Sequence, residues 1–97
     1  MGHYVSDPPI VQIKKTEDSA DEMTITCTVE SQPDAQVTWL KDGEEIEEET
    51  KNMIINNVIK NNTLKLVALD EEDFGNYTCV AENKLGMAED SVKISGM

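Results

Sequence analysis

Apolar and polar residues alternate along several short segments of this chain, with the period of two that is typical of β-strands. In the clearest segment, Met23, Ile25, Cys27 and Val29 alternate with three threonines. Other segments with the same period are Val37–Trp39, Leu64–Leu66, Tyr77–Ala81 and Ala88–Ile94. No helical period extends over about 11 residues, so the pattern predicts seven or eight short strands.

Turn-forming residues separate these segments at regular intervals. They include Gln32-Pro33-Asp34, Lys41-Asp42-Gly43, the acidic stretch Asp70–Asp73 and Asn83-Lys84-Leu85-Gly86. The Asp-Gly pair readily takes the positive φ angles of a tight hairpin. Short strands joined by regularly spaced turns predict an all-β fold, a sandwich of two sheets.

Three parts of the pattern are harder to interpret. The segment Met53–Ile59 predicts a weaker strand whose register the sequence does not fix. Simple alternation would bury Asp90, and an unpaired buried carboxylate is costly, so we expect a bulge or a rim position there. Before the short first strand Ile10–Ile13, Pro8-Pro9 favours extended backbone at an edge strand or a junction between domains.

The 97 residues suffice for one domain. We expect that domain to span residues 9–95, with residues 1–8 as expression-derived residues and a linker lead-in, and 96–97 as a tail. The start Met1–Ser6 formally fits a myristoylation pattern, but Met1-Gly2 is more simply a remnant of expression. No secretory signal and no apolar run of about 18 residues is visible, so we expect a domain cut from a longer protein.

The formal net charge of −12 narrows the classes of partner. Binding to nucleic acid needs clustered Lys and Arg, and docking on anionic lipid needs the same. We therefore expect neither nucleic-acid binding nor direct membrane contact, and the acidity is most simply explained by solubility. The run Glu44–Glu49 could bind calcium weakly, but it lacks the pattern of a dedicated site, and a solvated edge that discourages aggregation is the simpler interpretation.

The two cysteines, Cys27 and Cys79, each fall at an inward position in the middle of a strand. Two such cysteines on facing sheets can close a disulfide across the core, whereas in a reducing compartment they can stay reduced and pack as apolar side chains. The only histidine, His3, lies at the start of the chain, so neither a metal site nor a Cys-His catalytic pair is expected. We expect no cofactor and no enzymatic activity.

Trp39 and Tyr77 are expected to stabilise the core. The Trp39 ring is placed to cover the disulfide, and Tyr77 has the spacing of a tyrosine corner, in which the hydroxyl bonds to backbone near the preceding turn. Together with Cys27, Trp39-Leu40-Lys41-Asp42-Gly43 and Leu64-Lys65-Leu66, the stretch Asp73-Phe74-Gly75-Asn76-Tyr77-Thr78-Cys79 and its continuation to Gly86 resembles the I-set of the immunoglobulin superfamily. The core signature of this resemblance consists of Trp39, Leu66, Asp73, Gly75 and Tyr77.

The resemblance implies a Greek-key β-sandwich that binds or spaces other proteins and does not catalyse a reaction. The stretch Gly75–Gly86 is similar to domains of neuronal adhesion proteins, such as the IgLON and lachesin group and neural cell adhesion molecules. It is also similar to domains of the muscle proteins titin and twitchin. The expected partners are a protein, identical or different, or neighbouring immunoglobulin domains of the same chain. The chain departs from the I-set pattern at Lys51–Ile59.

Two glycosylation acceptor patterns help to choose between the cell surface, where the adhesion proteins act, and the cytoplasm, where the muscle proteins act. They are Asn61-Asn62-Thr63 and Asn76-Tyr77-Thr78, and both acceptors are expected to be accessible. Chance is the alternative explanation, since Asn is abundant in this chain. With the cysteine pair, the patterns favour a cell-surface adhesion or receptor ectodomain, and the resemblance to neuronal adhesion proteins implies a neuronal type. The alternative is a structural module of a muscle filament in the cytoplasm of the sarcomere.

If the domain binds a partner directly, we expect the surface to be the outward face of the strands around Trp39 and Cys79. That face carries Thr38, Leu40, Thr78, Val80 and Glu82, with Leu85 and Met87 at its margin. Leu40, Val80 and Met87 are the candidate protein-binding residues, because exposed apolar clusters can mark interfaces, although scattered surface apolar residues are also ordinary.

Overall fold

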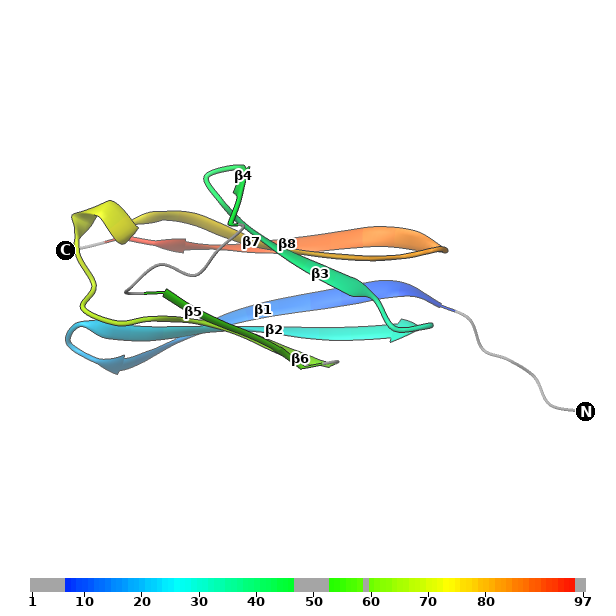
Figure 1. The fold of residues 1–97 in the computed structure, drawn as a ribbon, viewed down its shortest axis with the longest axis horizontal. Coiled ribbons are helices and arrows are strands. Elements are labelled where there is room, and N and C mark those ends of the chain that lie inside the picture. The colour runs from blue at the N-terminus through cyan, green and yellow to red at the C-terminus, as the bar shows by residue number, and fades with distance from the viewer. Residues whose placement is uncertain (1–6, 47–52, 59, 96–97) are drawn as a thin grey trace, which may run out of the picture.

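The computed structural model describes residues 7–46, 53–58 and 60–95. They form two antiparallel four-stranded sheets packed face to face, as the layers in Figure 1 show. The elements are β1 (Asp7–Ser19), β2 (Glu22–Gln32), β3 (Gln36–Lys41), β4 (Glu44–Glu45), β5 (Met53–Val58), β6 (Asn61–Leu66), the 3-10 turn η1 (Glu71–Asp73), β7 (Gly75–Asn83) and β8 (Gly86–Ile94).

The first sheet has the strand order β1-β2-β6-β5, and the second sheet has the order β4-β3-β7-β8. The predicted all-β sandwich is therefore confirmed. Strand β1 enters at one end of the long axis and β8 leaves at the other, so the start of β1 and the end of β8 lie at opposite ends of the sandwich (Figure 1).

The core forms where the inward residues of both sheets meet. Ile25, Leu64, Leu66, Trp39 and Tyr77 are almost fully buried there, in agreement with the alternation in the sequence. The disulfide between Cys27 and Cys79 joins β2 to β7 across this core, as the sequence predicts.

Strand β1 is longer than the short strand expected from Ile10–Ile13. It continues to Ser19 and pairs with β2 along its length, apart from irregularities near its two ends. The polar residues from Lys14 onward are exposed. Backbone pairing with β2 satisfies their amides and carbonyls whatever the side chains are, which explains why the apolar pattern underestimates the strand.

Strand β5 takes its register from β6, with Met53 opposite Leu66 and Asn57 opposite Asn62. Its inward positions are Met53, Ile55 and Asn57, so a polar residue interrupts the apolar alternation. The Asn57 Oδ1 accepts a hydrogen bond of 3.1 Å from the Trp39 Nε1. This contact between the sheets explains why a polar residue occupies an inward position.

Asp90 lies half-buried at the rim, and the pairing of β7 with β8 continues through it without a bulge. Its Oδ2 accepts a hydrogen bond of 3.1 Å from the Ile13 backbone N–H, and its Oδ1 accepts one of 3.0 Å from the Ser91 N–H. Nearby, the Lys15 Nζ donates to the Lys93 carbonyl at 3.0 Å. Side chains thus connect β1 to β8 between the two sheets.

Candidate protein-interaction surfaces

The corner before β7 is held by a compact set of hydrogen bonds. The Tyr77 hydroxyl donates to the Asp73 carbonyl at 2.6 Å, the contact that the spacing predicts. Asp70 caps η1: its Oδ1 accepts from the Glu72 N–H at 3.2 Å, and its own N–H donates to the Asp73 Oδ2 at 3.0 Å. Burial raises the pKa of Tyr77, and the charges of Asp73 and Asp42 raise it further. These contacts stabilise the corner between η1 and β7.

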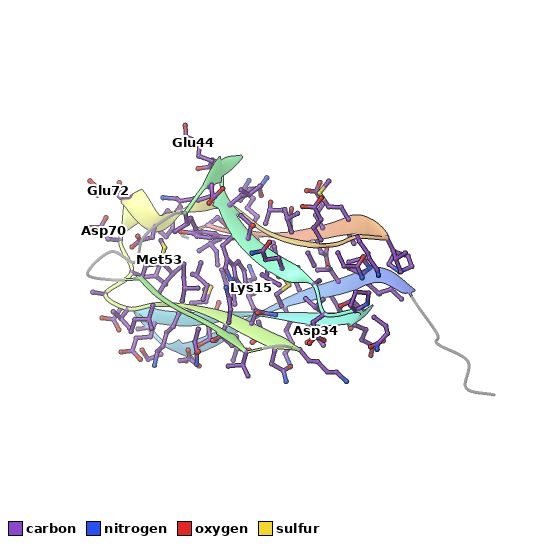
Figure 2. The ribbon with its side chains drawn as sticks, turned by 45° about the vertical axis from the view of Figure 1, so that its right-hand side comes forward. Lys15, Asp34, Glu44, Met53, Asp70 and Glu72 are labelled. Atoms are coloured by element: carbon purple, nitrogen blue, oxygen red, sulfur yellow. A yellow bond between two sulfur atoms is a disulfide. The ribbon has the colours of Figure 1, made fainter. Side chains whose placement is uncertain are left out.

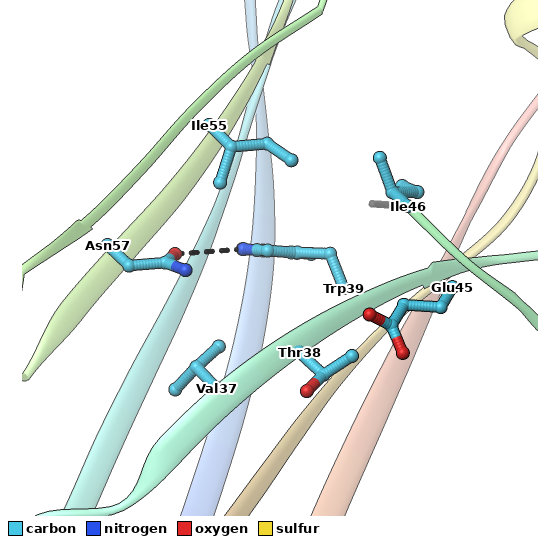
Figure 3. A pocket seen from close by; sticks show the side chains of 7 residues that line it. All are labelled: Val37, Thr38, Trp39, Glu45, Ile46, Ile55 and Asn57. Atoms are coloured by element: carbon cyan, nitrogen blue, oxygen red, sulfur yellow. Dashed lines mark hydrogen bonds between the residues drawn. The ribbon is translucent and has the colours of Figure 1, made fainter. Parts of the chain in front are cut away.

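A side opening between the sheets lies beside the buried tryptophan. It has a volume of about 290 Å³ and is lined by Val37, Thr38, Trp39, Glu45, Ile46, Ile55 and Asn57. Figure 3 shows the indole edge pointing across the opening to Asn57. The indole N–H is already satisfied, and Glu45 is the single ionisable group in the lining, so the opening brings together no pair of groups for acid–base or nucleophilic work.

The described residues contain no group of three or more His, Cys, Asp or Glu side chains that could hold a metal ion. Glu44, Asp70 and Glu72 lie toward the same end of the sandwich in Figure 2. Of the run Glu44–Glu49, the positions from 47 onward lie outside the described residues. Within the described segments no helix has the length and apolar character that crossing a bilayer requires.

The outer face of the second sheet brings the three candidate binding residues together. Leu40 pairs with Thr78, and the next outward position on β7 is Val80. Val80 pairs with Glu89, and the next outward position on β8 is Met87. The three apolar residues therefore form a diagonal stripe across β3, β7 and β8, at the spacing of diagonal neighbours.

The stripe is only partly accessible. Leu40 and Val80 are half-buried, whereas Met87 is 64% exposed. Three acidic residues flank it: Glu45 pairs with Leu40, Glu82 with Met87 and Glu89 with Val80. A different protein that covers the stripe would need an apolar centre and a basic rim, whereas an identical domain would need its glutamates to stay at the solvated rim of the contact.

The two glycosylation acceptors lie on opposite faces of the sandwich. Asn61 is exposed at the start of β6, on the outer face of the first sheet. Asn76 is exposed near the start of β7, on the outer face of the second sheet. In each pattern the threonine two residues later points to the same face, and Thr78 shares a hydrogen bond of 2.7 Å with Ser91.

Two contacts that position these surfaces have no clear signal in the sequence. The Asp42 Oδ1 accepts from the Asn76 N–H at 2.9 Å and so fixes the start of β7. The Trp39–Asn57 bond fixes β5 against β3. The Asp-Gly turn signalled Asp42 as a turn residue, but its partner could be found only from the pairing of strands distant in sequence.

Comparison with known proteins decides the family. Residues 8–95 match the model of the immunoglobulin I-set domain. The chain belongs to the I-set family.

Its relatives come from two settings. The I-set chain is 44% identical over 69 residues to the muscle M-line assembly protein unc-89 of Caenorhabditis elegans, covering 71% of this chain and 1% of that protein. It is 33% identical over 96 residues to neural cell adhesion molecule 1 of Bos taurus, covering 93% of this chain and 11% of that protein. The chain thus spans only a small fraction of these relatives' length.

A solved structure of titin domain M4 has the same fold. It superposes with a TM-score of 0.79 at 22% sequence identity, covering 93% of this chain and 96% of that one. The relatives therefore include both a cell adhesion molecule and a muscle protein.

Proposed function

We propose that this I-set domain is a non-catalytic interaction or spacer module of a cell-surface adhesion or receptor ectodomain, of neuronal type. The observation that carries the proposal is the exposure of both glycosylation acceptors, Asn61 and Asn76, each with its threonine on the same face. An acceptor must be accessible to carry a sugar. The closed Cys27–Cys79 disulfide, which oxidising compartments favour, supports the same location.

Two features support the mode of action. The two ends of the sandwich carry the two ends of the described chain, so such a module can space its neighbours along a line. The apolar stripe of Leu40, Val80 and Met87 supports direct protein binding through the second sheet, to an identical or a different partner.

Mass spectrometry after secretion tests the location. The domain is expressed through a eukaryotic secretory pathway, and its intact mass is measured with and without glycosidase and with and without reductant. We expect sugar on at least one acceptor and a deficit of two hydrogens that reductant removes. Asn61→Gln and Asn76→Gln, made singly, assign the sugar. Efficient secretion with both acceptors bare would count against the ectodomain.

A muscle filament module is the second candidate, and the 44% identity to the M-line assembly protein favours it. In that setting the domain would hold spacing under force, and its cysteines could remain reduced and packed in the core. Bare acceptors, together with full stability in the reduced state, would favour this alternative.

A further inference from the structure

The outer face of the first sheet contains a row of polar residues that runs from Asn61 across β2 to β1. Asn61 pairs with Thr28, and Thr28 pairs with Gln12. The next row repeats the arrangement with Thr63, Thr26 and Lys14. Because neighbouring strands are about 4.8 Å apart, Gln12 lies about 10 Å from Asn61, with Thr28 between them.

A shallow groove of about 290 Å³ occupies the β1–β2 side of these rows. Its lining consists of Gln12, Ile13, Lys14, Thr16, Thr26 and Thr28. The groove thus presents three hydroxyls, one amide and one ammonium group to solvent. These groups can both donate and accept hydrogen bonds, with the lysine donating only.

The threonine hydroxyls that line the groove make no hydrogen bond within the described part of the chain. Thr24 donates to Asp18, and Thr63 donates to the Asn56 carbonyl. Thr16, Thr26 and Thr28, by contrast, make no hydrogen bond to any other described side chain or backbone group beyond the strand ladder. Their hydroxyls are therefore available to a ligand.

The three rows around the groove contain no acidic residue, although Asp18 accepts a hydrogen bond from Thr24 at their margin and Glu30 is exposed two residues after Thr28. The outward residues of these rows are Gln12, Lys14, Thr16, Thr24, Thr26, Thr28, Ile54, Asn56, Val58, Asn61, Thr63 and Lys65. On the second sheet, Glu45, Glu82 and Glu89 lie directly beside the apolar stripe. A neutral ligand rich in hydroxyl and amide groups can pair with the hydroxyls, the amide and the ammonium group that line the groove.

We propose that this groove holds the first sugars of an N-linked oligosaccharide attached to Asn61. The inference rests on the proposed extracellular location. The row Asn61–Thr28–Gln12 gives the sugar chain a path, and a disaccharide is long enough to reach the groove. Hydroxyl and acetamido groups of the sugars pair with Thr28, Thr26 and Gln12. The bound sugars cover part of the outer face of the first sheet.

Thermal unfolding of matched glycoforms tests the proposal. The wild type and Thr26→Val/Thr28→Val are each secreted with and without the additional Asn61→Gln change. If the sugars dock, the melting temperature of the wild type exceeds that of its Asn61→Gln form by about 4–8 °C. In the valine background the difference should fall to less than half, because the hydroxyl partners are gone.

The effect of Asn61→Gln is compared within each background. Any effect of the valines on strand stability therefore cancels, because both valine proteins contain them. Thr38→Val on the outer face of the second sheet is the matched control and should leave the glycan-dependent difference unchanged. A sugar on Asn61 whose effect is absent, or equal in both backgrounds, overturns the docking proposal and leaves the proposed function standing. A bare Asn61 in the mass spectrum overturns docking and removes that acceptor as support for the ectodomain.

Discussion

The carboxylate of Asp42 occupies the space in front of Gly75 that a β-carbon would need. A β-carbon built at position 75 would lie 2.6 Å from the Asp42 Oδ2 and 2.7 Å from its Oδ1. Asp42 cannot easily move away, because its Oδ1 and its N–H are both bonded to the backbone of Asn76. Gly75 is therefore required by a contact between the β3–β4 turn and β7, as well as by its own φ of +151°.

Gly75→Ala should lower the free energy of unfolding by about 2–3 kcal/mol, because it adds a steric clash to an unfavourable backbone angle. Gly43→Ala is the matched control. Gly43 also has a positive φ, but no atom lies within 4 Å of its added β-carbon, so about 1 kcal/mol is expected. Urea denaturation measures both variants. Equal losses would mean that the Asp42 contact is unimportant.

Tyr77→Phe should cost about 1 kcal/mol at neutral pH, because it removes the bond to the Asp73 carbonyl. It should also change the stability at high pH. The pKa of Tyr77 is raised above its usual 10.0 in the folded state, so above that pH the unfolded chain binds fewer protons than the folded one. The wild type then loses stability as pH rises, by up to about 1.4 kcal/mol per unit.

The Phe variant lacks this contribution, so its unfolding free energy should fall less steeply between pH 10 and 11. Chemical denaturation at several pH values gives both slopes. The lysines titrate in the same range in both proteins, and the difference between the slopes cancels their effect. Parallel slopes would show that burial does not hold Tyr77 in its neutral form.

Asp90→Ala should weaken the attachment of β1, because the Ile13 amide loses its carboxylate acceptor. We expect a loss of about 1–3 kcal/mol and faster hydrogen exchange at the Ile13 amide. Glu89→Ala is the control: Glu89 is exposed on the outer face, and its removal should change stability by less than about 0.5 kcal/mol. Unchanged exchange at Ile13 in the Asp90 variant would contradict the assigned role.

Reduction of the Cys27–Cys79 disulfide should lower the stability by about 4 kcal/mol in the chain-entropy model. The measurement is the urea midpoint with and without reductant. Cys27→Ala/Cys79→Ala serves as the control, because its midpoint should not respond to reductant. If reduction leaves the wild-type midpoint unchanged, the bridge is not needed for stability, as a cytoplasmic module would require.

Leu40→Glu and Met87→Glu should each weaken homophilic association about tenfold, because they place charge in the apolar stripe. Clustering of beads coated with the domain measures this association, and melting temperatures exclude unfolding. Ile54→Glu is the matched control, since Ile54 is 48% exposed on the opposite face. Equal clustering by all four proteins would remove the stripe as a homophilic surface.

The core could be predicted from the sequence because local alternation sets which side chains face inward. Cys27, Trp39 and Tyr77 all fall at the inward positions that alternation gives them. Alternation also predicted that Leu40 and Val80 lie on the same face, because both are outward residues on neighbouring strands. It could not give their exposure, which depends on how neighbouring side chains cover them.

The remaining features depend on partners that are distant in sequence. The register of β5 follows from pairing with β6, and Asn57 breaks the apolar pattern because it bonds Trp39 on the other sheet. The groove that contains Gln12, Lys14 and Thr28 likewise exists only because β1 continues beside β2. Asp90 was placed at the rim by the cost of burying a charge, whereas its bond to Ile13 needed the three-dimensional arrangement.

The contact between β1 and β8 determines how the domain would respond to a pull on its ends. The two strands run in the same direction, with Ile13 beside Asp90 and Lys15 beside Lys93. Tension applied to residues 7 and 95 therefore slides β1 and β8 past each other along their length (Figure 1). In this shear geometry the bonds share the load and must break together, whereas bonds in a peeled hairpin break one after another.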